Sequence, residues 1–137
     1  MFFNRKKDLI DCQQQRADLQ RRLDAFNQNL ATIRFKPDGS IIEANTFFAG
    51  VLGYIPEEII DKHHRMFCDK NLINTSEYHK FWQDLANGIA QRGTFKRIHK
   101  NGGVMWIEAT YFPLKDENGK VVEVLKVAAD VTEDQDK

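Results

Sequence analysis

The chain has 137 residues, 42% of them hydrophobic, and it carries 20 basic and 20 acidic side chains. This length and composition predict one compact domain with a real core. The zero formal net charge argues against binding to nucleic-acid phosphates or to an anionic membrane surface. No apolar run approaches the roughly 18 residues of a membrane span, and the N-terminus lacks the apolar core of a secretory signal, so we expect a cytoplasmic protein.

Residues 1–30 predict an N-terminal amphipathic helix, because apolar side chains recur there at alternating steps of three and four residues, with Arg16 in one gap. A lone helix of this kind is marginal in water and must bury its apolar seam. We favour burial against a second copy, which predicts a homodimer. The alternative is a plain amphipathic helix packed on its own domain. The seam comprises Leu9, Cys12, Leu19, Leu23, Phe26 and Leu30.

A hairpin is predicted next, with strands at 31–36 and 41–44. The sequence Pro-Asp-Gly-Ser at 37–40 lies between these two apolar runs and is a strong turn signal.

Short helices are predicted between this hairpin and the remaining strands. Asn45 can cap a helix that runs to Leu52. Pro56 suits the first position of another helix, and residues 63–68 form a further helical stretch.

A longer amphipathic helix follows these short segments. Asn74 and Glu77 have the spacing of a capping box, with Ser76 as the alternative cap. Gly88 weakens the last turn. The apolar face comprises Tyr78, Phe81, Trp82, Leu85, Ala86 and Ile89.

Three strands are predicted at 93–100, 104–114 and 120–131, joined by Asn-Gly-containing turns of the type that matches strand twist. The order is two strands, several short helices and three strands, with short connections. It predicts an α+β fold in which a five-stranded antiparallel sheet carries short helices on one face.

The ordered motifs of residues 31–132 resemble those of PAS domains. The opening of such a domain is similar to FKPDGSIIEAN at 35–45 and LGYIPEEI at 52–59. Its hairpin is similar to KNG at 100–102 followed by WIE at 106–108. Asp130-Val131-Thr132 resembles the motif that closes the domain and joins it to a downstream signalling helix.

Residues 62–68, together with Glu77-Tyr78 and Phe81-Trp82 of the long helix, are most similar to the PAS domains of methyl-accepting chemotaxis proteins and of energy-taxis and biofilm-dispersal sensors. The resemblance implies a sensory domain at 31–132, preceded by the helix at 1–30 and followed by the start of a linker at 133–137. Such a domain senses redox state, a gas or a small ligand. It passes the signal to an output module and to the chemotaxis kinase complex. The alternative is a ligand-free PAS dimerisation module.

The resemblance also implies a cleft between the sheet and its helices, for which FAD is the first cofactor, haem the second and an empty, filled core the third alternative. Trp82-Gln83-Asp84-Leu85 matches a Trp-x-x-Leu pattern of flavin-binding redox sensors, although Trp82 could equally be core packing. The candidate cofactor-binding residues are His64, Phe67, Trp82, Phe95, Arg97 and Trp106.

Two departures from the pattern argue against flavin. Cys68 and Asp69 stand where the flavin sensors have an Arg-His pair. Arg97, which only donates hydrogen bonds, stands where they have an asparagine, and it could instead pair with an anionic ligand or a local carboxylate. His64 aligns with the reactive cysteine of light-sensing LOV domains, and Cys68 lies one turn further on, about 6 Å along a helix, so no cysteinyl-flavin adduct is expected.

Haem would need an axial histidine, and His63, His64, His79 and His99 are the four available. Adjacent residues on a helix diverge by about 100°, so at most one of His63 and His64 could bind the iron. We take His64 as the metal ligand if haem is present. Each histidine is otherwise a surface or core residue.

No enzyme motif is found. The sequence has no phosphate-binding GxxxxGK[ST] loop, no HExxH zinc helix and no GxSxG elbow. Cys68 beside His63 and His64 lacks a third, orienting group. Cys12 and Cys68 are too few for a disulfide scaffold and are expected to be reduced. We therefore expect a protein without catalytic activity.

Overall fold

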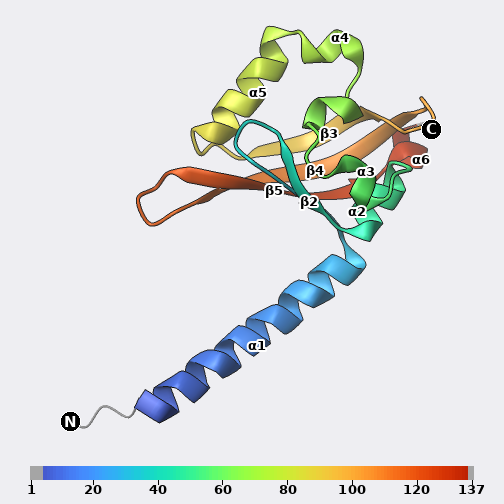
Figure 1. Cartoon of the computed structure of the whole chain (residues 1–137). Coiled ribbons are helices and arrows are strands. Elements are labelled where there is room, and N and C mark those ends of the chain that lie inside the picture. Colours follow the sequence, from blue (N-terminus) through green and yellow to red (C-terminus); the bar gives the residue numbers. More distant parts are fainter. Residues whose placement is uncertain (1–4, 136–137) are drawn as a thin grey trace.

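The computed structural model describes residues 5–135, and their strands form one antiparallel sheet in the order β2-β1-β5-β4-β3. The domain's short helices lie across one face of this sheet, which confirms the predicted α+β fold (Figure 1). The last strand of the chain, β5, is the central one. The elements are α1 (Arg5–Asn29), β1 (Ala31–Phe35), β2 (Ile41–Ala44), α2 (Thr46–Val51), α3 (Pro56–Ile59), η1 (His64–Phe67), α4 (Lys70–Ile73), α5 (Ser76–Ala86), β3 (Gln91–Ile98), β4 (Val104–Lys115), β5 (Val121–Asp130) and α6 (Thr132–Gln135).

The inner face of the sheet has an unusual residue at its centre. Strand pairing places Ile33, Lys126 and Tyr111 in one row across β1, β5 and β4. All three side chains are at most 1% exposed. Because side chains alternate between the faces of a strand, the row belongs wholly to the covered face. Lys126 is therefore a basic group in the middle of the core.

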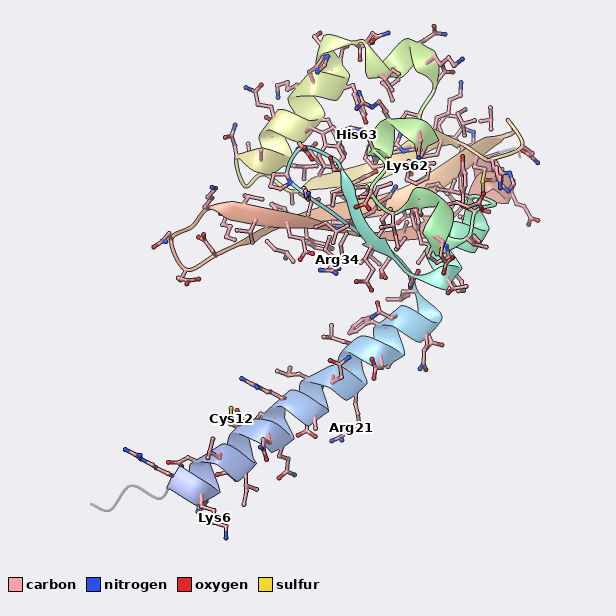
Figure 2. All side chains as sticks on the ribbon, in the orientation of Figure 1. Lys6, Cys12, Arg21, Arg34, Lys62 and His63 are labelled. Carbon is pink, nitrogen blue, oxygen red and sulfur yellow. The ribbon has the colours of Figure 1, made fainter. Side chains whose placement is uncertain are left out.

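The helix α1 has no buried residue, and it extends away from the sheet (Figure 1). Leu9, Leu19 and Leu23 of the predicted seam are each more than half exposed. Figure 2 shows Cys12 and Arg21 on this helix, away from the rest of the chain. The alternative in which the helix packs on its own domain is thus not the arrangement found.

Asn45 caps α2 as predicted and also ties this helix to the end of α1. Its Oδ1 accepts a hydrogen bond from the Phe48 amide at 2.8 Å. Its Nδ2 donates to the carbonyl oxygens of Asn27 and Leu30, at 2.8 and 2.6 Å. One side chain therefore fixes how the chain leaves α1 and enters the sheet domain.

The start of α5 differs from the prediction. Thr75 is the N-cap, and its Oγ1 accepts a hydrogen bond from the Tyr78 amide at 3.2 Å. Neither Asn74 nor Ser76 has this role. The three neighbours are all good capping residues, so sequence alone did not distinguish them.

The end of α5 and the segment before it also differ. The helix ends at Ala86, because Gly88 takes a left-handed φ of 90°, and Ile89 lies beyond it, 53% exposed. A short helix at Lys70–Ile73 was not predicted. Its N-cap is Asp69, which accepts a hydrogen bond from the amide two residues ahead.

Candidate functional site

A buried histidine held by two tyrosines lies at the centre of the space between α5 and the sheet. His64 Nδ1 is 2.9 Å from the Tyr78 hydroxyl, and His64 Nε2 is 2.9 Å from the Tyr111 hydroxyl. A neutral imidazole has one donor and one acceptor nitrogen, so one hydroxyl accepts a hydrogen bond and the other donates one. The two tyrosines therefore fix the orientation of the ring.

Arg97 approaches the same cluster from β3 and is 3% exposed. Its Nη2 donates to the Tyr111 hydroxyl at 3.1 Å, and its Nη1 donates to the Lys96 carbonyl at 2.9 Å. The guanidinium carbon lies 4.9 Å from the centre of the Phe95 ring. Its Nε has no hydrogen-bond partner. Arg97 is thus only partly satisfied by its surroundings.

Lys126 enters the cluster from β5 and lies against aromatic rings. Its Nζ is 4.8 Å from the centre of the Tyr111 ring and 5.2 Å from that of Phe48. Its Nζ has no hydrogen-bond partner of ordinary geometry, although the nearby Tyr111 hydroxyl acts to raise its pKa. Among the described residues, no carboxylate forms an ion pair with Lys126 or Arg97. Cation–π contacts offset only part of the hydration free energy that a cation loses on burial.

The buried groups influence one another's protonation. Burial holds the pKa of His64 well below its usual range, and the positive charges of Arg97 and Lys126 lower it further, so the ring is neutral at pH 7. Burial raises the pKa of the Tyr111 phenol, but the same two cations outweigh it, and that pKa lies below its ordinary value. Burial lowers the pKa of Lys126. The two buried cations therefore favour the neutral form of His64 and the ionised form of the Tyr111 phenol.

Aromatic rings fill the remaining space. The Trp82 ring packs edge-on against His64 and Phe35, with centroid distances of 5.2 and 5.3 Å. Phe81 and Phe95 pack edge-on against Tyr111, at 4.8 and 5.6 Å. Edge-to-face packing of this kind adds about 0.5–1.5 kcal/mol per pair beyond the burial of area. The indole Nε1 of Trp82 is buried without a hydrogen-bond partner.

The structure brings most of the predicted site residues together, but not Trp106. That residue alternates with the buried Ile107 along β4, so its side chain lies on the opposite face of the sheet from Tyr111. Its backbone amide instead donates to Thr132 Oγ1 at 3.0 Å. The residues gathered in or beside the cluster are His64, Phe67, Trp82, Phe95 and Arg97.

Sequence reasoning did not assign Lys126, Tyr78 or Tyr111 to the site. The available signal for Lys126 was a lone lysine inside the apolar run Val-Leu-Lys-Val-Ala-Ala at 124–129 of the last predicted strand. No comparable signal marked Tyr78, whose hydroxyl lies opposite His64 only because η1 and α5 pack together.

The described packing does not fit a flavin. Two hollows border the interior, one of about 330 Å³ near α2 and one of about 220 Å³ beside Tyr78 and Trp82, and neither is lined by His64, Arg97 or Lys126. A flavin ring would have to displace aromatic side chains that are in mutual contact.

His64, the predicted axial haem ligand, does not fit that role, and neither does His63. Both ring nitrogens of His64 are occupied by tyrosine hydroxyls. His63 uses Nε2 against the Asp38 carbonyl at 2.7 Å and Nδ1 against the Arg65 amide at 3.1 Å. Among the described residues, no group of three or more His, Cys, Asp or Glu side chains could hold a metal ion.

A curved antiparallel sheet covered on one face by short helices around an aromatic and histidine-containing interior defines a PAS-type domain. The chain belongs to the PAS family: the family model described as the PAS fold matches residues 41–128. No helix in the described part of the chain combines the length and apolar character needed to span a membrane.

Among curated relatives, the chain is 36% identical over 119 residues to the biofilm dispersion protein BdlA of Pseudomonas aeruginosa. The matched segment covers 87% of this chain and 28% of BdlA. It is 28% identical to Phototropin-1A of Oryza sativa subsp. japonica, over 84% of the chain and 12% of that protein. The chain thus spans only a minor part of these relatives.

Two solved structures resemble the fold closely. A PAS domain from Colwellia psychrerythraea has a TM-score of 0.73 and 25% identity, over 84% of this chain and 98% of that one. A light-oxygen-voltage domain studied with a flavin analogue has a TM-score of 0.68 and 23% identity, over 82% of this chain and 85% of that one. At that identity the second likeness concerns the fold alone.

Proposed function

We propose that this PAS domain is the sensory domain of a cytoplasmic, methyl-accepting chemotaxis-type protein. In this proposal it detects a small ligand, a gas or a redox change in its interior and passes the signal to an output module and the chemotaxis kinase complex. It acts by changing contacts and not by catalysis. The similarity to BdlA over 87% of the chain supports this placement in a signalling protein.

The observation that carries the proposal is the junction between β5 and α6. Asp130 Oδ1 accepts hydrogen bonds from the amide and the hydroxyl of Thr132, at 2.9 and 2.6 Å. The Val131 amide donates to the Trp106 carbonyl at 2.9 Å. The start of α6 is therefore fastened to both β5 and β4. Since Lys126 and Asp130 lie on the same central strand, a change inside the domain has a short route to this junction.

Asp130→Ala in the full-length protein should shift the activity of the chemotaxis kinase by about fivefold or more, the lower range of site-to-site coupling. The substitution removes the carboxylate that accepts both Thr132 hydrogen bonds at the start of α6, and it leaves the cluster of His64, Tyr78 and Tyr111 untouched. The measurement is kinase autophosphorylation in a reconstituted receptor–kinase complex.

Asp116→Ala is the matched control, because Asp116 Oδ1 also accepts two local hydrogen bonds, in this case from the Asn118 and Lys120 amides in a distant turn. This control should leave kinase activity unchanged. A kinase that does not respond to the wild-type protein at all would remove the chemotaxis assignment.

We also propose that two copies of α1 form a homodimer through the exposed seam. In the full chain, Leu19→Lys and Leu23→Lys should each convert a dimer to a monomer, because each puts a charge into an apolar helix interface. Sedimentation equilibrium measures the mass. Gln14→Lys, on the helix side opposite the seam, is the control and should remain dimeric. A wild-type chain that is monomeric at high concentration contradicts this proposal.

A ligand-free dimerisation module is the second candidate function, and the ring-filled interior favours it. The two functions make different demands on the core. A pure dimerisation module should lose its effect on the kinase when the seam is disrupted, and it should be insensitive to conservative changes in the interior. A sensory domain should respond to both kinds of change.

A further inference from the structure

Two buried basic side chains lack a counter-ion inside this domain. Lys126 is fully buried, Arg97 is 3% exposed, and neither forms an ion pair with a carboxylate of the described residues. Lys126 Nζ, Arg97 Nε and Trp82 Nε1 are buried donors without a partner of ordinary hydrogen-bond geometry, although the Tyr111 hydroxyl lies near Lys126 and the Tyr78 hydroxyl near Trp82. Buried charges and donors in proteins are normally paired, so this cluster is complementary to a missing acceptor with negative charge.

An apolar hollow of about 330 Å³ lies between α2, the end of α1 and one end of the sheet. Phe48 forms part of its wall, and the same ring lies 5.2 Å from Lys126 Nζ. Ala128, two residues from Lys126 on the same face of β5, also lines it. The Phe48 ring therefore separates the hollow from an unpaired ammonium group.

The lining of this hollow includes residues at both junctions of the sheet domain, with α1 and with α6. Leu30, at the end of α1, and Asp130, at the junction with α6, each contribute to it. The Asp130 carboxylate is already bonded to Thr132. The other side chains include Phe47, Val51 and Ile107, so the hollow suits an apolar molecule of small size.

We propose that the domain binds a small organic monocarboxylate, with its apolar body in the hollow and its carboxylate paired with Lys126 once the Phe48 ring turns aside. This inference rests on the proposed sensory function and names the chemical class of its ligand. Arg97 adds a second positive charge that strengthens the attraction. A neutral analogue leaves the cations unpaired, and an amine is repelled by them.

Isothermal titration calorimetry of the full chain with phenylacetate, phenylacetamide and acetate tests this assignment. Phenylacetate should bind, while its amide, of the same shape but uncharged, should bind at least about tenfold more weakly. Acetate carries the charge without the apolar body and should also bind at least about tenfold more weakly. Equal binding of phenylacetate and its amide would show that the cations have no part in recognition. Equal binding of acetate would remove the role of the hollow.

Two substitutions locate the site. Lys126→Met should weaken phenylacetate binding by about tenfold or more, and Lys120→Met, in an exposed turn, should not. Val51→Phe fills the hollow without touching the charge and should also abolish binding. Circular dichroism checks that each variant is folded. Unchanged binding in both Lys126→Met and Val51→Phe would overturn the assignment, as would wild-type protein that binds no phenylacetate at millimolar concentration.

The failure of this inference is distinguishable from the failure of the sensory function. If phenylacetate does not bind but Asp130→Ala still shifts kinase activity, the ligand class is wrong and the signalling role stands. If phenylacetate binds and the kinase ignores both phenylacetate and Asp130→Ala, the ligand class stands and the chemotaxis assignment falls.

Discussion

Replacing Lys126 by methionine should raise the free energy of unfolding by about 1–4 kcal/mol, the range found when buried ion pairs are replaced by apolar side chains of similar volume. Methionine keeps the unbranched shape of lysine and adapts well to core packing. It removes an ammonium group that has no hydrogen-bond partner and no carboxylate. The contacts with the Tyr111 and Phe48 rings remain available to the thioether.

Urea denaturation at pH 7, without added carboxylate, measures this change. Lys120→Met is the control, and because Lys120 is exposed, its effect should stay within about 0.5 kcal/mol. A Lys126→Met variant less stable than the wild type would mean that the ammonium makes a net stabilising interaction in the core and is not an unpaired, destabilising group.

A stabilising substitution at Lys126 has a consequence for function. Proteins keep destabilising groups in their cores mainly where a site needs them. At the same concentration, phenylacetate should therefore raise the melting temperature of the wild type, by mass action on the folded state, more than that of Lys126→Met. The same substitution would then raise the free energy of unfolding and weaken the response to the ligand.

Sequence reasoning predicted the fold because its signals are local. A Pro-Asp-Gly turn, an Asn cap and Asn-Gly turns each depend on a few neighbouring residues, and together they specify the order of strands and helices. Thr75 escaped notice because several adjacent residues could cap α5 equally well.

The site was less predictable because it depends on which face of each strand is covered. Trp106 was assigned to the interior, but a shift of one residue in a strand exchanges the two faces, and the residue lies on the other side. Lys126 was overlooked because lysine is rarely buried. Only the placement of β5 at the centre of the sheet reveals that this lysine is enclosed.

Acid should destabilise the domain through His64. In the unfolded chain a histidine takes up a proton near its ordinary pKa of about 6.5. In the folded chain, burial first and then Arg97 and Lys126 hold the pKa of His64 well below that value. Between the two pKa values the unfolded state binds one proton more, so the free energy of unfolding rises with pH. This contribution is fully present above pH 6.5 and is lost as the pH falls toward the folded-state pKa.

We therefore expect the wild type to lose about 1.5–2 kcal/mol between pH 6.5 and 5, measured by urea denaturation at stepped pH. Carboxylates contribute little in this window, since their ordinary pKa values lie near 4. His64→Gln replaces the ring with a group that still donates and accepts hydrogen bonds but does not titrate. It should lower stability at pH 7 by about 1–3 kcal/mol, because one tyrosine hydroxyl loses its partner, and it should flatten the pH dependence.

The matched control is His79→Gln, which changes an exposed histidine on α5 and should keep the wild-type pH dependence. The decisive quantity is the slope between pH 6.5 and 5, and not the stability at any one pH. A His64→Gln slope equal to that of the wild type would mean that another group takes up the proton. In that case His64 would have to be charged in the folded state, and two tyrosine hydroxyls beside two cations would be holding a third positive charge. The electrostatic description of the whole cluster, including its affinity for an anion, would then need to be replaced.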